Sequence, residues 1–301
     1  MLEARFSCSK FGARADFTHV TFKNVVRFDD AKLGDLTSFT DARFLGEATF
    51  SVRDVDKANP KFQRINFSNA SFFGPCSFEN RKFTANASFN DAEFHDLAKF
   101  HGCTFHQGMS FHGTKFLKTK GDSKDKDELN KQTGRLEQAY RTLKLGMETL
   151  RARNEEAYFF AKEMECRRQR SDVPWFERLV AAPIYKGLSN YGQNVFRPLV
   201  LLLALTLFSF LFYRDFGAIP GAPFRNQTEV FSFTLEQTFK PFTILSIQME
   251  DGKTDCTKAT GRKFVHCYPL IIPFLASGQS LATLGLLALF LLALRRRFKM
   301  D

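Results

Sequence analysis

Four Phe-His pairs and a cysteine crowd into residues 94–113, which read FHDLAKFHGCTFHQGMSFHG. The residues that could bind a metal are His95, His101, His106, His112 and Cys103. Imidazole and thiolate groups are the ligands that zinc prefers in proteins, so a cluster this dense raises the question of a metal site. A shared metal requires that the histidines face one another, and the spacing of the phenylalanines decides whether they do.

Phenylalanine recurs at alternating spacings of five and six residues through the first 120 residues, and the chain holds 37 Phe against one Trp and six Tyr. A stretch over 51–65 interrupts the repeat, and Pro60 within it predicts a loop or bulge. Neither a helix nor a long strand has this period. The repeated positions are Phe6, Phe11, Phe17, Phe22, Phe28, Leu33, Phe39, Phe44, Phe50, Phe67, Phe72, Phe78, Phe83, Phe89, Phe94, Phe100, Phe105, Phe111 and Phe116.

A small side chain usually stands two residues before each repeated position. In an extended segment, residues i and i−2 point to the same side, so each unit sends one bulky and one small residue inward. This pattern predicts a β-solenoid whose stacked coils bury a ladder of Phe rings. The small residues are Ala15, Val20, Val26, Ala31, Ala42, Ala48, Ala70, Cys76, Ala87, Ala92, Ala98 and Cys103.

The segments ASFNDAEF, FTDARFLGEATF and FSNASF resemble the Phe-rich pentapeptide-repeat proteins. The resemblance covers roughly residues 6–116 and implies a right-handed quadrilateral β-helix, with coils nearer 22 than 20 residues because of the six-residue units. Some relatives mimic DNA, which requires a strongly acidic surface. Residues 1–120 instead carry 17 Lys and Arg against 13 Asp and Glu, so we expect no nucleic-acid-related role.

Each histidine directly follows an inward Phe and should therefore point outward. On a four-sided helix, His95, His101, His106 and His112 would occupy four different faces and could not share a metal. With only two units per coil, His95 would stack on His106, and a metal ladder would return. We expect four faces, no metal and no cofactor. On this view Phe100→Asp unfolds the solenoid and His101→Ala does not.

Residues 121–194 read as a charged helical connector that follows a polar linker. Two apolar sets at helical spacing predict two antiparallel helices joined near RARNEE. The pair either caps the open end of the solenoid or also couples it to an oligomer or a membrane. The two sets are Leu136, Tyr140, Leu143 and Met147, followed by Ala157, Phe160, Ala161 and Met164.

An apolar stretch rich in aromatic residues ends the connector and predicts a short interfacial helix. Its large residues are Trp175, Phe176, Leu179, Val180 and Tyr185. The segments AYRTLK, AYFFAKEMECRR and LSNYGQNVFRPL resemble the juxtamembrane region of bacterial pentapeptide-repeat membrane proteins. That resemblance implies two transmembrane helices after the soluble repeats, and some relatives carry a potassium-channel-like pore module.

Two apolar segments predict membrane spans at residues 195–214 and within 269–301. The second ends in the basic residues Arg295, Arg296, Arg297 and Lys299, and no apolar segment opens the chain. The positive-inside rule then places both termini in the cytoplasm and residues 215–268 outside an inner membrane. Cys256 and Cys267 would lie on the oxidising side, where we expect a disulfide, the alternative being two free thiols.

The segment between the spans contains FSFTLEQTFKPFTIL at 231–245, too short to span but apolar enough to dip into the bilayer or lie on it. The potassium-filter signature TVGYG is absent, so potassium selectivity is not expected. A pore would be non-selective or would attract cations through carboxylates at its entrance, for which the candidates are Glu236, Glu250, Asp251 and Asp255.

The second span carries a stripe of polar and small residues that could line a pore or pack helices together. Because two thin spans offer little to bury Gln279 within one subunit, we expect a homo-oligomer, and the channel analogy favours a tetramer. The stripe consists of Ser277, Gly278, Gln279, Ser280, Ala282 and Thr283.

Two functions remain open from the sequence, and no catalytic constellation suggests an enzyme. The first is an oligomeric, pore-forming or channel-like inner-membrane protein whose cytoplasmic solenoid (1–120) acts as sensor or docking domain. The second is a membrane-tethered scaffold whose solenoid binds a cytosolic protein while the spans only anchor it.

Overall fold

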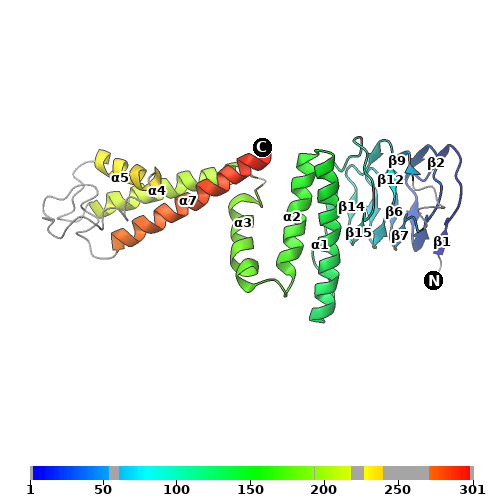
Figure 1. The fold of residues 1–301 in the computed structure, drawn as a ribbon, viewed down its shortest axis with the longest axis horizontal. Coiled ribbons are helices and arrows are strands. Elements are labelled where there is room, and N and C mark those ends of the chain that lie inside the picture. The colour runs from blue at the N-terminus through cyan, green and yellow to red at the C-terminus, as the bar shows by residue number, and fades with distance from the viewer. Residues whose placement is uncertain (1–2, 54–60, 193, 218–226, 240–270, 299–301) are drawn as a thin grey trace. The chain divides into compact units, whose positions relative to one another are not determined.

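The computed structural model describes residues 3–53, 61–192, 194–217, 227–239 and 271–298 (Figure 1). The chain divides into two compact units, Met1–Pro183 and Ile184–Asp301. The first unit holds the solenoid and the helices that cap it. The second holds the apolar helices, and each unit is described by itself below.

The first unit begins with four parallel sheets, which are the four sides of a solenoid of about five turns. This arrangement confirms the predicted β-solenoid. One side contains β1 (Glu3–Arg5), β4 (Val25–Arg27), β7 (Ala48–Thr49), β11 (Cys76–Ser77) and β15 (Ala98–Lys99). A second contains β3 (Thr21–Phe22), β6 (Arg43–Phe44), β10 (Ser71–Phe72), β14 (Glu93–Phe94) and β16 (Lys115–Phe116). A third contains β2 (Arg14–Asp16), β5 (Leu36–Ser38), β9 (Arg64–Asn66) and β13 (Ala87–Ser88), and the fourth contains β8 (Lys61–Phe62) and β12 (Lys82–Phe83).

The Phe ladder fills the solenoid axis, as the repeat predicts. The rings of Phe28, Phe50, Phe78 and Phe100 stack on one another with centroids 5.1, 5.0 and 4.9 Å apart. The small partners pair in the same register, Val26 with Ala48, Ala48 with Cys76 and Cys76 with Ala98. Most coils therefore hold 22 residues, and one holds 28. The irregular stretch inserts six residues without breaking the ladder, while 54–60, with Pro60, lies outside the described residues.

Left-handed backbone conformations recur every eleven residues in the solenoid, both before and after the insertion. Asp30, Asp41, Asn80 and Asp91 have φ between 56° and 62°. Asp and Asn tolerate this conformation better than other residues with a Cβ, and Gly102 and Gly113 take the same place in the last coil. These corners explain why polar residues of the repeat recur at fixed distances from the Phe positions.

Arg81 is fully buried in a place where most coils have a small residue, two residues before Phe83. Its guanidinium donates to the backbone oxygens of Phe28, Ala31 and Phe50, the first two at 3.1 Å, and lies 4.5 Å above the Phe62 ring. Burial lowers the pKa of Arg81 to about 10, against the opposing effect of Asp30 and Asp29. Arg81 thus ties successive coils together beside the insertion.

Helices α1 (Lys126–Thr149) and α2 (Arg153–Gln169) form the predicted antiparallel pair and cover the last coil (Figure 1). The Phe116 ring contacts Tyr140 and Phe159, and the backbone N–H of Phe116 donates to the Tyr158 hydroxyl at 3.0 Å. Asp125 caps the N-terminus of α1 by accepting from the N–H of Asp127. The helical pair therefore caps the Phe ladder.

The predicted buried face of α2 is wrong in detail. Its fully buried residues are Phe159, Glu163 and Cys166, whereas Ala157, Phe160, Ala161 and Met164 are only half-buried. Phe159 belongs inside because it closes the ladder against Phe111 at 5.6 Å. Glu163 belongs inside because α1 supplies cations for both of its oxygens.

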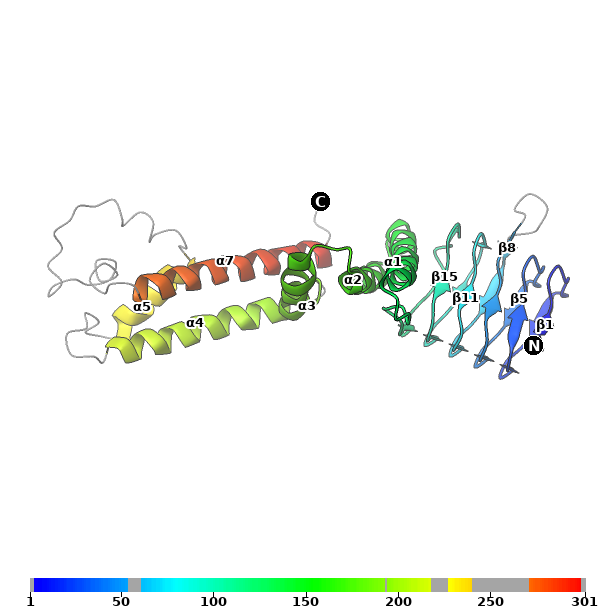
Figure 2. The same cartoon turned by 90° about the horizontal axis from the view of Figure 1, so that it is seen from below.

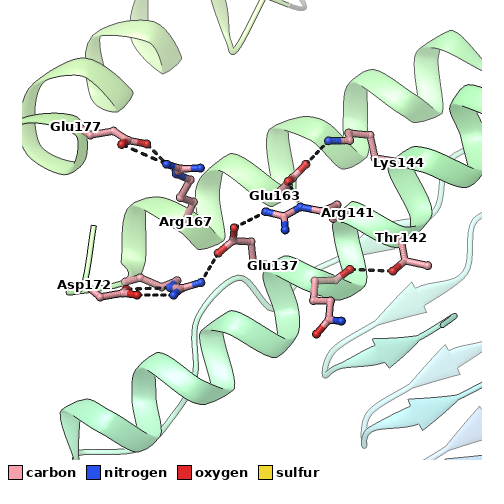
Figure 3. A network of polar contacts seen from close by, with 10 residues as sticks. Glu137, Arg141, Thr142, Lys144, Glu163, Arg167, Asp172 and Glu177 are labelled. Atoms are coloured by element: carbon pink, nitrogen blue, oxygen red, sulfur yellow. Dashed lines mark hydrogen bonds and ion pairs between the residues drawn. The ribbon is translucent and has the colours of Figure 1, made fainter. Parts of the chain in front are cut away.

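Those cations belong to a network of ion pairs between α1 and α2 (Figure 3). Arg141 Nε lies 2.7 Å from Glu163 Oε1, and Lys144 Nζ lies 2.7 Å from Glu163 Oε2. Arg141 and Arg170 each lie 2.8 Å from Glu137. Buried carboxylates are tolerated when they are paired in this way, and the pairs lock the register of the two helices.

The residues after α2 expose the apolar side chains that the sequence assigns to an interface. A π-helical turn, η1 (Glu177–Ala181), leads into α3 (Ala182–Ser189). Trp175, Phe176 and Leu179 are 68%, 56% and 63% exposed. Exposing such apolar side chains to water is unfavourable, whereas the headgroup region of a bilayer accommodates them.

Candidate functional site

The second unit contains two helices that are long and apolar enough to cross a membrane, α4 (Phe196–Gly217) and α7 (Ile271–Phe298). Their most apolar segments, Phe196–Arg214 and Ser277–Arg295, have mean hydropathies of 1.9 and 1.8. Only 17% and 28% of the residues in these segments are buried. A core helix of a soluble protein would be mostly buried, so the exposure favours a lipid environment.

A third, shorter helix, α5 (Gln227–Phe239), packs against both α4 and α7 (Figure 2). Its 13 residues extend about 20 Å, less than the hydrocarbon core of a bilayer. Val230, Thr234, Gln237 and Thr238 form its buried face. Three of these four side chains are polar, which is unusual for a helix that packs between two apolar ones.

A cluster of buried polar side chains joins the three helices. The Tyr213 hydroxyl of α4 donates to Oε1 of Gln279 at 2.9 Å. Nε2 of Gln279 donates to the Thr238 hydroxyl at 3.1 Å and approaches the Thr234 carbonyl at 3.5 Å. The Ser280 hydroxyl donates to the backbone carbonyl of Gln237 at 3.2 Å, and the Thr283 hydroxyl donates to the backbone carbonyl of Gln279 at 2.8 Å. We call this set of side chains, with Gln237, the polar cluster.

The expectation that one subunit cannot bury Gln279 is wrong. The residue is 5% exposed, and each end of its amide has a partner within the chain. Besides the two spans, α5 supplies hydroxyl and carbonyl groups that face α7. Gln279 alone therefore does not require association with a second copy.

Gln237 is the exception in the polar cluster. The residue is fully buried, but neither Nε2 nor Oε1 of its side chain has a hydrogen-bond partner in the described structure. An unsatisfied buried amide costs about 1–3 kcal/mol, and water cannot approach freely within a bilayer. A group that hydrogen-bonds or coordinates would remove this cost.

The predicted stripe on α7 separates into two faces. Gln279, Ser280 and Thr283 face inward and are 5%, 2% and 4% exposed. Gly278 and Ala282 are exposed, and Ser277 is half-buried. A Cβ built on Gly278 or Gly285 would meet nothing within 4 Å. Ala282, Gly285 and Ala288 instead line an apolar groove of about 740 Å³ with residues of α3 and α4.

Several predicted residues lie beyond what the structure describes. Glu236 lies on α5, but its side chain is not among those described. Glu250, Asp251 and Asp255 fall outside the described residues, as do both members of the expected disulfide, Cys256 and Cys267. The acidic pore entrance and the disulfide therefore stay predictions.

The histidines lie on four different sides of the solenoid, as expected. The residues just before them lie on different sides: Phe94 is in β14, and Lys99, two residues before His101, is in β15. Thr104, two residues before His106, pairs with Lys82 of β12, and Ser110, two residues before His112, pairs with Ser88 of β13. His95 stacks on Phe73, 22 residues earlier, at 4.5 Å, which excludes stacking on His106. Among the described residues, no three His, Cys, Asp or Glu side chains gather as a metal site would require.

The predicted core phenylalanines occupy the ladder. Phe72, Phe78, Phe83, Phe89, Phe94, Phe100 and Phe111 are at most 5% exposed. Phe105 is half-buried, because it lies at the capped end against Gly146 of α1. The sequence did not predict a role for five residues of the core and the polar cluster: Arg81, Tyr213, Thr234, Gln237 and Thr238. Arg81 does break the small-residue pattern, a visible signal, whereas nothing in the local sequence pairs Tyr213 with Gln279.

The fold and cluster define a class of protein: a Phe-ladder β-solenoid joined through a helical cap to a unit with two apolar helices. Comparison of the chain with known protein families, with curated proteins and with solved structures finds no match.

Proposed function

We propose that this chain is a pentapeptide-repeat membrane protein that forms an oligomeric, channel-like pore, with the solenoid as a cytoplasmic sensor or docking domain. Support for the family comes from coils of 22 residues, a stacked Phe ladder and small residues beside it. The absence of a TVGYG segment argues against potassium selectivity.

The observation that carries the pore proposal is the unpartnered amide of Gln237 within the polar cluster. Helices that only anchor a protein bury apolar side chains against one another, because polar groups are costly in hydrocarbon. Here a short helix between two spans carries hydroxyl and amide groups into the centre of the bundle. Neutral oxygens can replace the hydration shell of a monovalent cation in transit.

Oligomerisation is supported by the exposed face of α7. Gly278, Ala282 and Gly285 leave its backbone open to a neighbouring helix, as small residues do in membrane dimers. The potassium-channel analogy favours four copies. The basic residues after the second span, such as Arg295 and Arg297, support an inner-membrane topology with both termini in the cytoplasm.

Ion flux through liposomes or planar bilayers containing the purified chain tests the proposal. We expect conductance from the wild-type chain and a loss of conductance in Gln237→Leu. Because the Gln237 amide has no hydrogen-bond partner among the described residues, this variant should fold at least as well as the wild type. Thr206→Val is the matched control, since the Thr206 hydroxyl donates within its own helix, to the Leu202 carbonyl at 2.9 Å, and outside the polar cluster. Wild-type protein that never conducts would refute a pore.

A scaffold is the second candidate function, and the intramolecular partners of Gln279 favour it. A cluster that satisfies most of its own polar groups can also serve only to hold α4, α5 and α7 together. Replacing residues 195–301 by an unrelated membrane anchor discriminates the two functions. A scaffold keeps its activity in that chimera, whereas a pore loses it.

A further inference from the structure

One side of the solenoid carries lysines stacked on lysines. Lys10 pairs with Lys32 across adjacent coils, and Lys61 pairs with Lys82. These four residues, which we call the lysine column, are all exposed. Thr104 pairs with Lys82 and ends the column in the last coil. Lys32 and Lys61 belong to consecutive coils, but no strand pairing joins these two residues in the described structure. Because adjacent strands are about 4.8 Å apart, the two pairs together extend over about 14 Å.

Like charges directly opposite one another destabilise a sheet, and elsewhere the solenoid avoids the problem. Lys115 pairs in register with Glu93, and their charged atoms are 2.8 Å apart. Arg5 does stack on Arg27, but Glu3 forms an ion pair with both. In contrast, Lys10, Lys32 and Lys82 form no ion pair with any residue that the structure describes.

The surface beside the lysine column is bare at its first two coils. Gly12 and Gly34 follow the inward Phe11 and Leu33, so they occupy the next outward positions. A Cβ on Gly34 would lie 1.7 Å from the Gly12 carbonyl oxygen, so the close approach of the coils requires glycine there. The result is a narrow file of ammonium groups next to exposed backbone.

We propose that the lysine column is a docking site for an extended acidic segment of a cytosolic protein. Alternate side chains of an extended peptide are about 6.8 Å apart on one side, so two or three carboxylates match the length of the column. A nucleic-acid duplex fits less well, because it needs a broad positive surface and the other sides of the solenoid carry mixed charges. The inference rests on the docking role that both proposed functions give the solenoid.

Binding of a labelled oligoglutamate peptide to the full chain in detergent, followed by fluorescence anisotropy, tests the proposal. We expect oligoglutamate to bind, oligoglutamine not to bind, and binding to weaken as salt is raised. The triple variant K10Q/K32Q/K82Q should bind about tenfold more weakly, since each exposed ion pair contributes only a small factor. The matched control K23Q/R43Q/R64Q removes three exposed cations from other sides and should bind as the wild type does.

Equal loss in both triple variants would overturn the assignment to this side of the solenoid. Tighter binding of a single-stranded oligonucleotide or of anionic vesicles than of oligoglutamate would overturn the assignment to a peptide. Lys32→Glu gives an independent reading: it should weaken peptide binding and raise Tm, because it relieves repulsion with Lys10. A lower Tm would mean that the column serves the fold. Peptide binding is measured in solution, so its failure is distinguishable from failure of the pore.

Discussion

The hydroxyl group of Tyr213 donates a hydrogen bond of 2.9 Å to Oε1 of Gln279, a residue 66 positions further along the chain. The bond joins the two apolar helices, α4 and α7, directly to each other. It orients the Gln279 amide so that Nε2 points to Thr238 of α5. The arrangement of all three helices therefore depends on this pair.

Removing the Tyr213 hydroxyl should loosen the bundle. We expect Tyr213→Phe to lower the free energy of unfolding by about 1 kcal/mol, since it leaves one end of a buried amide unsatisfied. Unfolding of the detergent-solubilised chain in increasing SDS measures the change, with Thr206→Val as the control. Equal stability of Tyr213→Phe and the wild type would show that the bond adds nothing.

Two glycines of α1 should respond oppositely to alanine. A Cβ on Gly146 would lie 2.3 and 2.4 Å from ring atoms of Phe105, whereas a Cβ on Gly134 meets nothing closer than Arg170 at 3.6 Å. Alanine in an open helical site stabilises by about 1 kcal/mol. We therefore expect Gly134→Ala to raise Tm and Gly146→Ala to lower it. A rise in both variants would mean that Phe105 moves aside at little cost.

Substitutions of the buried residue Arg81 should destabilise the solenoid strongly. Arg81→Ala leaves a cavity and deprives the carbonyls of Phe28, Ala31 and Phe50 of a donor, which should cost about 3 kcal/mol or more. Arg81→Lys should be intermediate, because a single ammonium cannot reproduce the forked geometry. Hydrogen exchange of the solenoid amides measures the loss. Lys23→Ala, at an exposed position outside the lysine column, should leave exchange unchanged.

The Glu93–Lys115 pair should add an acid-sensitive contribution. The hydrogen bond from Lys115 lowers the pKa of Glu93, so the stabilisation is present above the unfolded pKa of about 4.3 and is lost as pH falls through the lower folded value. We expect Lys115→Met to be slightly less stable than the wild type at pH 7 and equally stable at low pH. Melting curves across this range test the sign. A deficit that persisted in acid would point to lost packing instead.

The cysteines should fall into three groups. Cys8 is exposed and should react with a maleimide at once, whereas burial raises the pKa of Cys103 and of Cys166 to about 12 and that of Cys76 well above its usual value. If Cys256 and Cys267 form the expected disulfide, the unfolded chain shows four thiols before reduction and six after. Six thiols without a reductant would exclude the disulfide.

The sequence by itself determined the solenoid, because its information is local and repeated. Each unit places its Phe inward, so the five/six spacing is enough to derive the ladder and the outward direction of the histidines. The number of units in a coil stayed open from the spacing, and only the family resemblance implied the four-sided coil of about 22 residues that the strand register confirms. The two apolar helices followed from length and composition alone. Even the insertion over 51–65 was visible as a break in rhythm, because the repeat resumes in phase after it.

Only the tertiary structure decided which polar groups meet. A glutamine in a span is compatible both with a pore lining and with a helix contact, so the residue type of Gln279 does not decide between them. Its hydrogen-bond partners are Tyr213 and Thr238, which are far away in the chain. A glutamate such as Glu163 is usually expected on the surface. It is buried here because Arg141 and Lys144 form ion pairs with its two oxygens. The lysine column exists only because successive coils stack on one another, which pairs Lys10 with Lys32 and Lys61 with Lys82. Such contacts between distant residues arise from packing, which no local period encodes.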